Sequence, residues 1–204
     1  MIQPARSNPP LVVYGAGGHG RTVADAARTA GLDVLGFVDD AEHAGRLDPA
    51  DRRLDAAVWI VGIGDNRVRE RIHGRLAEQN RRLFSVLHPQ AAFSPEARAA
   101  DGVYVGPHAV VGPGAEVGPG AIVNSAAVVE HDTVVAAAVH VAPGAVVGGG
   151  VTIGRRSLVG LGARVLPGLT LGEDTVLAAG AVLTRDTPGG GTWVGVPARP
   201  RRRG

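Results

Sequence analysis

A branched apolar residue occupies every sixth position over the second half of the chain, with no insertion or deletion. The fourteen anchor positions are Val105, Val111, Val117, Val123, Val129, Val135, Val141, Val147, Ile153, Val159, Val165, Leu171, Leu177 and Leu183. Glycine often follows an anchor directly, and a small residue usually stands four positions after it. This period predicts a parallel β-helix, in which each hexapeptide lays one short strand on one face of a prism. Three faces make a coil of about 18 residues, so we expect between four and five coils.

The first part of the chain follows another pattern, in which apolar runs alternate with stretches of helical character. We expect strands at Leu11–Tyr14, Val34–Val38, Ala57–Gly62 and Leu83–Leu87, and helices at Thr22–Ala30 and Arg67–Gln79. Such alternation predicts a small parallel sheet covered by helices. The expected fold is therefore an α/β domain over residues 1–90 and an all-β parallel β-helix with a C-terminal tail over 91–204.

Composition narrows the class of protein. Hydrophobic residues make up 45% and charged residues 20% of 204, as in an ordinary globular protein, while 31 glycines and only 3% aromatics suit small repeated packing units. The chain has no cysteine, which excludes disulfide scaffolds, cysteine zinc sites and thiol nucleophiles. No apolar run approaches a membrane span of about 18 residues, and the first ten residues lack the apolar stretch of a signal peptide. We expect a cytoplasmic protein.

The net charge gives little support to nucleic-acid binding. The formal charge is +2, and all the basic residues are arginine. Four of these arginines, Arg199, Arg201, Arg202 and Arg203, stand in the last six residues, and without them 17 basic residues face 19 acidic ones. Only a short tail is basic, so we expect neither a nucleic-acid nor a membrane partner.

A glycine motif follows the first expected strand directly. Gly15, Gly17 and Gly20 match G-x-G-x-x-G between a strand and a helix, where glycines allow a tight turn and the helix N-terminus attracts phosphate. Asp39 and Asp40 follow the second strand, where an acid can bind a ribose hydroxyl. This Rossmann-like pattern suggests a nicotinamide dehydrogenase, but the second mononucleotide-binding half is missing. A single nucleotide diphosphate fits better.

Six motifs together give the chain a resemblance from about residue 10 to 200. They are YGAGGHGR at 14–21, FVDD at 37–40, GIGDN at 62–66, NSAAVVEHD at 124–132, VHVAPGA at 139–145 and VGVPAR at 194–199. The chain resembles the NeuD/PglD-like sugar O- and N-acetyltransferases. The resemblance implies a left-handed β-helix, an acetyl-CoA donor, a homotrimer and, in many members, a nucleotide-linked amino sugar as acceptor. Ala136, Ala137 and Ala138 depart from the polar turn common in the family, which weakens inferences about local acceptor contacts.

His131 is the candidate general base, because it stands at a turn position and its pKa can lie near working pH. Asp132 follows it and could orient the imidazole; the resemblance assigns these same two roles. Gly149 lies eighteen residues later, in the same column one coil along, and the family places an oxyanion donor there. The alternative interpretation is a solvated His-Asp turn.

The resemblance also implies two binding sets. It places acetyl-CoA contacts at His140, Leu161 and Ala179, the last two of which share a column with Ser125 and Pro143. It implies nucleotide-sugar contacts at Gly17, Gly18, His19, Asp39, Asp40 and Gly64. The alternative interpretation of His19 is a helix-capping or exposed residue. The terminal arginines could meet the 3′-phosphate of CoA or form a solvated tail.

Two other classes compete with a transferase. Some hexapeptide-repeat proteins, such as γ-class carbonic anhydrases, bind zinc through three histidines, but His108 lies 23 residues before His131 and outside its column. We therefore expect no metal. A non-catalytic nucleotide-sugar-binding assembly protein is the other class.

The sequence therefore predicts an acetyl-CoA-dependent acetyltransferase acting on the amino group of a nucleotide-linked amino sugar, of the UDP-4-amino-sugar kind. The alternative is O-acetylation of sialic acid or a related sugar. His140 stands nine residues after His131, half a coil away. We therefore expect the two histidines to meet only across a subunit boundary.

Overall fold

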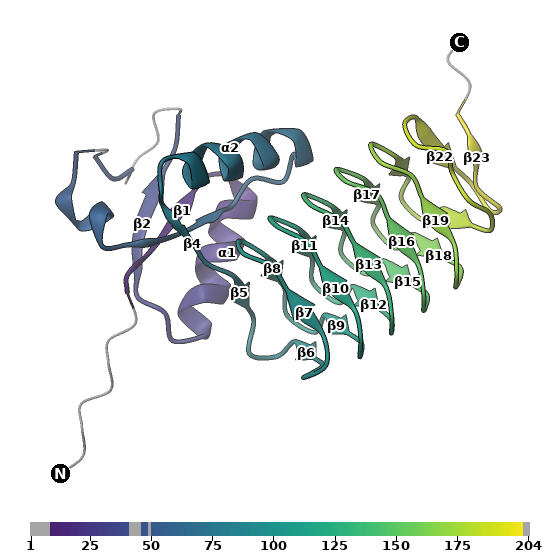
Figure 1. The fold of residues 1–204 in the computed structure, drawn as a ribbon, viewed down its shortest axis with the longest axis horizontal. Helices are drawn as coiled ribbons and strands as arrows, with labels where there is room; N and C mark the ends of the chain where they lie inside the picture. Colours follow the sequence, from purple (N-terminus) through teal and green to yellow (C-terminus); the bar gives the residue numbers. More distant parts are fainter. Residues whose placement is uncertain (1–8, 41–45, 49, 202–204) are drawn as a thin grey trace.

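The computed structural model describes residues 9–40, 46–48 and 50–201. It has two parts, a small α/β domain and a long parallel β-solenoid that extends away from it (Figure 1). This is the predicted fold class. The expectations for the first eight residues and for Arg202 and Arg203 fall outside the described residues.

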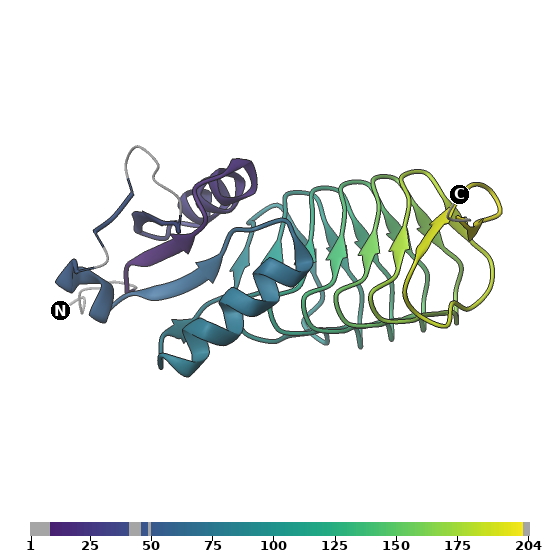
Figure 2. The same cartoon turned by 90° about the horizontal axis from the view of Figure 1, so that it is seen from above.

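The α/β domain is a four-stranded parallel sheet in the order β2-β1-β3-β4. Its elements are β1 (Leu11–Tyr14), α1 (Gly18–Thr29), β2 (Val34–Val38), the 3-10 helix η1 (Arg52–Asp55), β3 (Val58–Val61), α2 (Asn66–Glu78) and β4 (Arg82–Leu83). Side chains alternate across β1, so Leu11 and Val13 pack with α1, whereas Val12 and Tyr14 pack with α2. The two helices therefore cover opposite faces of the sheet (Figure 2).

The expected strand Leu83–Leu87 is wrong, because two strands share these residues. β4 ends at Leu83, and β5 (Val86–Leu87) pairs instead with β8 of the solenoid. Between them the Ser85 hydroxyl donates to the carbonyl of Ala100 at 2.8 Å, which draws the chain onto the first coil. The change of architecture thus lies at Val86, a few residues before residue 90.

Three parallel sheets form the faces of the solenoid. The domain-facing sheet holds β5, β8 (Tyr104–Val105), β11 (Ile122–Val123), β14 (His140–Val141), β17 (Leu158–Val159), β20 (Val176–Leu177), β22 (Thr192–Val194) and β23 (Arg199–Pro200), the last antiparallel. The valine sheet holds β6 (Ala92–Phe93), β9 (Val110–Val111), β12 (Val128–Val129), β15 (Val146–Val147), β18 (Arg164–Val165) and β21 (Val182–Leu183). The outer sheet holds β7 (Arg98–Ala99), β10 (Glu116–Val117), β13 (Val134–Val135), β16 (Thr152–Ile153) and β19 (Thr170–Leu171).

The six strands of the valine sheet show six stacked coils, more than the four to five expected. The six-residue period extends backwards through Leu87, Phe93 and Ala99. Because these three residues are not all branched apolar residues, the sequence pattern did not include them. All fourteen anchors are buried and form one continuous core. Small residues such as Ala109 and Ser157 fill the remaining inward positions, which explains the shortage of aromatics.

Corners between the faces repeat with the same period. Every sixth residue from Gly102 to Asp174 has a positive φ, and seven of these thirteen positions are glycine. The left-handed conformation costs free energy for residues that carry a Cβ, although Asn and Asp adopt it more readily than most. Asp132, with a φ of 55°, is one of the exceptions.

α1 has 12 residues and α2 has 13. Within the described part of the chain, no helix is long and apolar enough to cross a membrane.

Replacing a stacked anchor should destabilise the solenoid. Leu171 is fully buried, and Leu→Ala at such a site costs about 2–5 kcal/mol because a cavity remains. We expect Leu171→Ala to lower the denaturation midpoint clearly in a chemical unfolding curve. Val134→Ala, at a position 40% exposed, is the control and should change it little. Equal midpoints for the two variants would contradict the stacked core.

Candidate active site

His131 and Asp132 form a pair at the corner between β12 and β13, where the chain passes from the valine sheet to the outer sheet. Nδ1 of His131 lies 2.9 Å from Oδ2 of Asp132, and both side chains are exposed, at 59% and 75%. The hydrogen bond with Asp132 is the main cause that raises the pKa of His131, with desolvation opposing it. An imidazole held through Nδ1 keeps Nε2 available for proton exchange.

Gly149 lies directly along the column from His131. A Cβ at this position would clash with Nε2 of the imidazole, so the ring rests over a residue that has no side chain. The ladder occupies the neighbouring groups, because Gly150 N–H donates to the carbonyl of His131 at 2.9 Å and Gly168 N–H donates to that of Gly149. Gly149 N–H donates to no group among the described residues. It is therefore available to an oxyanion.

The glycine motif builds an open turn above the sheet. Gly20 packs against the carbonyl of Gly15, so close that a Cβ at Gly20 would collide with it. Gly17 and Gly18 have open space where a side chain would be, and no side chain caps α1 at Gly17. A helix N-terminus with free N–H groups attracts phosphate. Gly64, which follows β3, is open in the same way.

The two aspartates that follow β2 form hydrogen bonds with different partners. Asp39 accepts from the backbone N–H of Ala16 at 2.7 Å, and this bond braces the glycine turn. Asp40 accepts from the Tyr14 hydroxyl and pairs with Arg75. The bond from Tyr14 lowers the pKa of Asp40. Asp39 therefore shapes the turn, while Asp40 remains exposed beside it.

His19 and His140 come together beneath this turn, at the boundary between the domain and the solenoid. Their ring centroids lie 6.1 Å apart, and His19 also meets the Tyr104 ring edge-on at 5.4 Å. The Asn124 amide nitrogen lies 3.1 Å from Nε2 of His140, and its amide oxygen accepts from Ser125 N–H. The amide therefore donates to Nε2, so His140 carries its proton on Nδ1, which faces the Gly64 backbone.

Both of these histidines are neutral at pH 7. Burial lowers the pKa of His19 to about 4, and the charge of Arg69 adds to the effect. Burial lowers the pKa of His140 to about 4 as well, again with Arg69 contributing. Nε2 of His19 and the hydroxyl of Tyr104 are buried and have no hydrogen-bond partner among the described residues. They are the polar atoms that a ligand could satisfy.

A cavity of about 290 Å³ opens beside His140. Its lining includes Gly64, Asp65, Asn66, Arg67, His140, Arg156, Leu158, Asp174 and Val176. Gly64 and His140, which the sequence assigned to different ligands, thus share one cavity.

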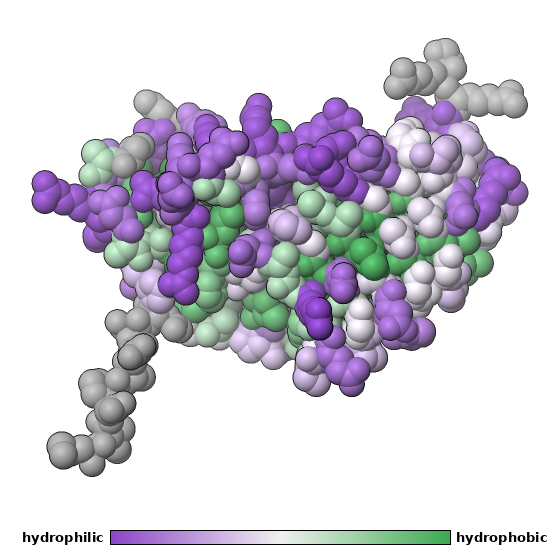
Figure 3. All heavy atoms as spheres, in the orientation of Figure 1, coloured by the Kyte–Doolittle hydropathy of each residue, from purple (hydrophilic) through white to green (hydrophobic). Residues whose placement is uncertain are grey.

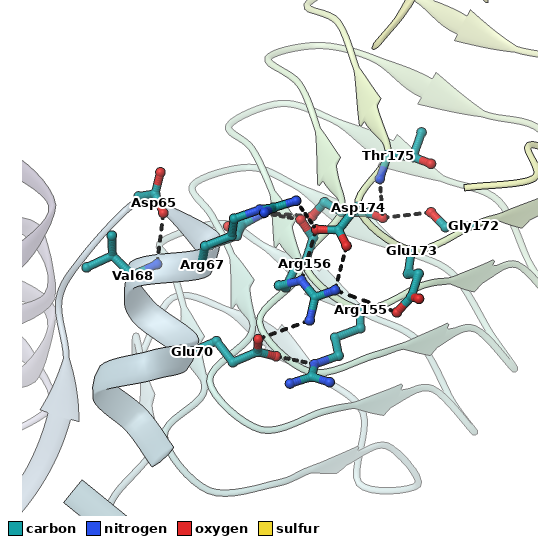
Figure 4. Close-up of polar contacts among 12 residues, drawn as sticks. Asp65, Arg67, Val68, Glu70, Arg155, Arg156, Gly172, Glu173, Asp174 and Thr175 are labelled. Carbon is teal, nitrogen blue, oxygen red and sulfur yellow. Dashed lines mark hydrogen bonds and ion pairs between the residues drawn. The ribbon is translucent and has the colours of Figure 1, made fainter. Parts of the chain in front are cut away.

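Ion pairs form the wall of the cavity between α2 and the solenoid (Figure 4). Arg156 lies 2.5 Å from Asp174 and 3.2 Å from Glu70, and Arg67 reaches Asp174 at 3.0 Å. Arg155 also pairs with Glu70. Hydrophilic side chains accordingly cover the α2 side of the molecule, while apolar ones gather on the solenoid below it (Figure 3).

Leu161 and Ala179 lie on the corner between the domain-facing and valine sheets. They share a column, since Gly180 N–H donates to the carbonyl of Leu161 at 2.8 Å. Leu161 is 59% exposed although it is apolar, and Ala179 is exposed too. The predicted acetyl-CoA set is therefore spread over one face and its corner, whereas His131 lies on a different corner of the same prism.

Sequence reasoning missed Asn124, Asn66 and Arg69. Asn124 takes the place after an anchor where glycine is common, and this exception was a usable signal. Arg69 shares the buried face of α2 with Ile72 and Leu76. A charged residue within the apolar stripe of a helix was the sequence signal for it. Among the described residues no group of three or more His, Asp or Glu could hold a metal ion.

Comparisons with known proteins cover both parts of the chain. A family model described as the PglD N-terminal domain matches residues 10–76. A mutant of perosamine N-acetyltransferase from Caulobacter crescentus, solved with CoA and GDP-perosamine, is 34% identical over 95% of this chain and 97% of that chain, with a TM-score of 0.90. The acetyltransferase domain of PglB from Neisseria gonorrhoeae is 35% identical over 95% and 100%, with a TM-score of 0.88. WeeI from Acinetobacter baumannii is 25% identical over 94% and 99%, with a TM-score of 0.82.

The His131–Asp132 bond can be tested by titration. Asp132→Asn removes the carboxylate, so we expect the pKa of His131 to fall back toward about 6.5. Glu130→Gln, which removes a weaker influence, should lower it less. NMR titration of the imidazole measures both. An unchanged His131 pKa in Asp132→Asn would show that the pair does not persist in solution.

Burial of His19 and His140 should make the fold sensitive to acid. Their pKa values are lowered in the folded state, so between about pH 6.5 and about 4 the unfolded chain binds more protons. Stability therefore falls as pH falls through this window. His140→Gln should flatten the decline in a series of unfolding curves. The same slope in this variant as in the wild type would contradict a neutral, buried His140.

Proposed function

Because the chain belongs to the NeuD/PglD-like family of sugar acetyltransferases, we propose that it transfers the acetyl group of acetyl-CoA to the amino group of a nucleotide-linked amino sugar. The observation that carries this proposal is the exposed His131–Asp132 pair resting over Gly149. An acetyl transfer needs a base for the acceptor, a donor for the oxyanion and a scaffold that holds both substrates. This corner offers the first two.

In the proposed reaction, Nε2 of His131 accepts the proton that the acceptor amine loses as it attacks the thioester carbonyl. Asp132 holds the ring through Nδ1 and stabilises the imidazolium that forms. Gly149 N–H donates to the oxyanion of the tetrahedral intermediate. When the carbon–sulfur bond breaks, His131 returns the proton to the departing thiolate of CoA, so that no net proton stays on the protein.

The α/β domain would hold the nucleotide end of the acceptor. The open turn at Gly17 and Gly18 and the free N-terminus of α1 suit a diphosphate. The cavity between Gly64 and His140 suits the sugar. The His19 ring lies beside His140, and its Nε2 has no partner in the described part of the chain. The proposed acetyl-CoA contacts remain His140, Leu161 and Ala179, of which Leu161 offers an exposed apolar surface.

The proposed enzyme works as a homotrimer with shared sites. His131 lies on the corner between the valine and outer sheets, while His19, His140 and Gly64 lie at the domain-facing sheet. One chain therefore holds the base and the acceptor cavity on different sides. A cyclic assembly would bring His131 of one subunit to the cavity of the next.

The outward side chains of the valine sheet support such an assembly. They are apolar except for one arginine, namely Ala92, Val110, Val128, Val146, Arg164 and Val182. The outer sheet instead presents polar residues at most of these positions.

Acetyl-CoA and nucleotide sugars are metabolites of the cell interior, so we propose that the protein is cytoplasmic.

An acceptor screen tests the function. The purified protein is mixed with acetyl-CoA and either a UDP-, GDP- or CMP-linked amino sugar, including GDP-perosamine, or a sialic acid, and the release of CoA is followed. Mass spectrometry should show one added acetyl group that resists hydroxylamine, as an amide does. A hydroxylamine-labile product from a sialic acid would favour O-acetylation instead. No turnover with any sugar would favour a non-catalytic binding protein.

His131→Ala should keep the fold and acetyl-CoA binding but lose roughly 10²–10⁴-fold in kcat, the usual contribution of a general base. His108→Ala is the matched control, because His108 is another corner histidine of the same solenoid. Its kcat should match the wild type. Near-normal turnover by His131→Ala would remove this residue from the mechanism.

Mixing inactive subunits tests the shared site. We expect His131→Ala and His140→Ala chains, refolded together, to recover part of the activity, because some boundaries would combine an intact His131 with an intact cavity. Each variant refolded alone gives the baseline. Sedimentation analysis gives the assembly size. Full activity in a demonstrated monomer would rule out the shared site.

A further inference from the structure

Arg69 is a buried cation whose hydrogen-bond partners among the described residues are all neutral. Only 1% of the surface of Arg69 is exposed to solvent. The guanidinium donates to the carbonyls of Ile63 and Gly64 at 3.0 Å each, of Gly120 at 2.7 Å and of Ala138 at 2.8 Å, and to the Asn66 amide oxygen at 2.7 Å. Burying a charge without an opposite charge is costly, so the bonds that compensate it must all be made. This arrangement ties the position of the guanidinium to the backbone around it.

These bonds join the two parts of the chain at one point. Ile63 and Gly64 belong to the turn that follows β3, whereas Gly120 and Ala138 are corners of two successive coils. Asn66 extends the contact to the next coil, because its amide nitrogen donates to the carbonyls of Arg156 at 2.9 Å and Ser157 at 3.0 Å.

α2 fits this row of corners because of its pitch. One helical turn rises about 5.4 Å, and neighbouring coils lie about 4.8 Å apart. Residues about one helical turn apart therefore reach different corners. His73 meets the corner at Asp101, Arg69 bridges the next two corners at Gly120 and Ala138, and Asn66 meets the following one at Arg156. Figure 2 shows α2 extending toward the coils.

The Gly64 turn that Arg69 holds is part of the acceptor cavity. The Gly64 backbone hydrogen-bonds His140, and Asn124 holds the other nitrogen of that ring. Gly64 and His140 line the same cavity of about 290 Å³. Any displacement of the turn would therefore change the width of the cavity and free the imidazole to rotate.

We propose that Arg69 is a positioning residue for the acceptor: it fixes the Gly64 turn against His140 and so sets the affinity for the sugar. This inference rests on the proposed function of the cavity. The charge of Arg69 acts in the same direction as burial, because both lower the pKa of His140 and keep its ring neutral. Asp65 and Glu70 are the acidic groups whose charges act on Arg69 itself.

Steady-state kinetics of Arg69→Met test the proposal. We expect the KM for the nucleotide amino sugar to rise about tenfold or more, while the KM for acetyl-CoA stays within about twofold. Arg71→Met removes an exposed cation from the same helix and should change neither. Arg69→Lys retains the charge with fewer donors and should restore part of the acceptor affinity. An acceptor KM equal to that of Arg71→Met, or an equal rise in both KM values, would overturn the proposal.

A second measurement does not depend on enzyme activity, and it can use Arg69→Lys if Arg69→Met does not fold. Hydrogen–deuterium exchange over residues 62–66 should be at least tenfold faster in Arg69→Met than in Arg71→Met; Arg69→Lys, with a smaller acceleration, replaces Arg69→Met if that chain does not fold. Equal exchange would overturn the role of Arg69. If the wild type acetylates no amino sugar, the proposed function fails, and exchange alone then decides whether Arg69 holds the turn.

Discussion

The ladder of hydrogen bonds between parallel coils is the constraint on which the rest of the structure depends. From β5 to β21 each coil repeats the register of the one before it, so residues eighteen apart pair directly, as Glu116 does with Val134. The ladder turns a linear period into columns. It places the imidazole of His131 over Gly149, where a side chain would collide with it. It also lines up the corners that α2 contacts. The proposed catalytic corner and the domain attachment therefore both depend on one geometric repeat.

The same scaffold creates two opposite environments for histidine. At an outer corner, His131 is solvated and bonded to a carboxylate, which raises its pKa and suits it to accept a proton. At the domain boundary, His19 and His140 are buried near a cation, which lowers the pKa of both. These two rings are suited to hydrogen bonding in fixed directions rather than to proton transfer. Position in the fold, and not residue type, thus separates the proposed base from the proposed binding residues.

The attachment of the domain combines charged and neutral contacts. Exposed and half-buried ion pairs such as Arg67–Asp174 lie at the rim and are screened by solvent. Arg69 lies behind them and donates to carbonyl and amide oxygens. A guanidinium can meet such a set because it presents five donors in a rigid plane. The rim pairs join α2 to the solenoid at the surface, whereas the buried cation bonds directly to the carbonyls of the Gly64 turn.

The sequence by itself determined the elements whose signal is local or periodic. The anchors from Val105 to Leu183, the strands β1 and β2, the glycine turn and the pairing of His131 with Asp132 all depend on neighbours in the chain or on a fixed repeat. Only the tertiary structure decided contacts between distant segments. It divided the expected strand Leu83–Leu87 between two sheets and brought His19 beside His140. It also made Arg69 the link between Gly64 and the coil corners. No local rule predicts such contacts, because they arise from how α2 and the first coils pack, and packing depends on the whole surface of both partners.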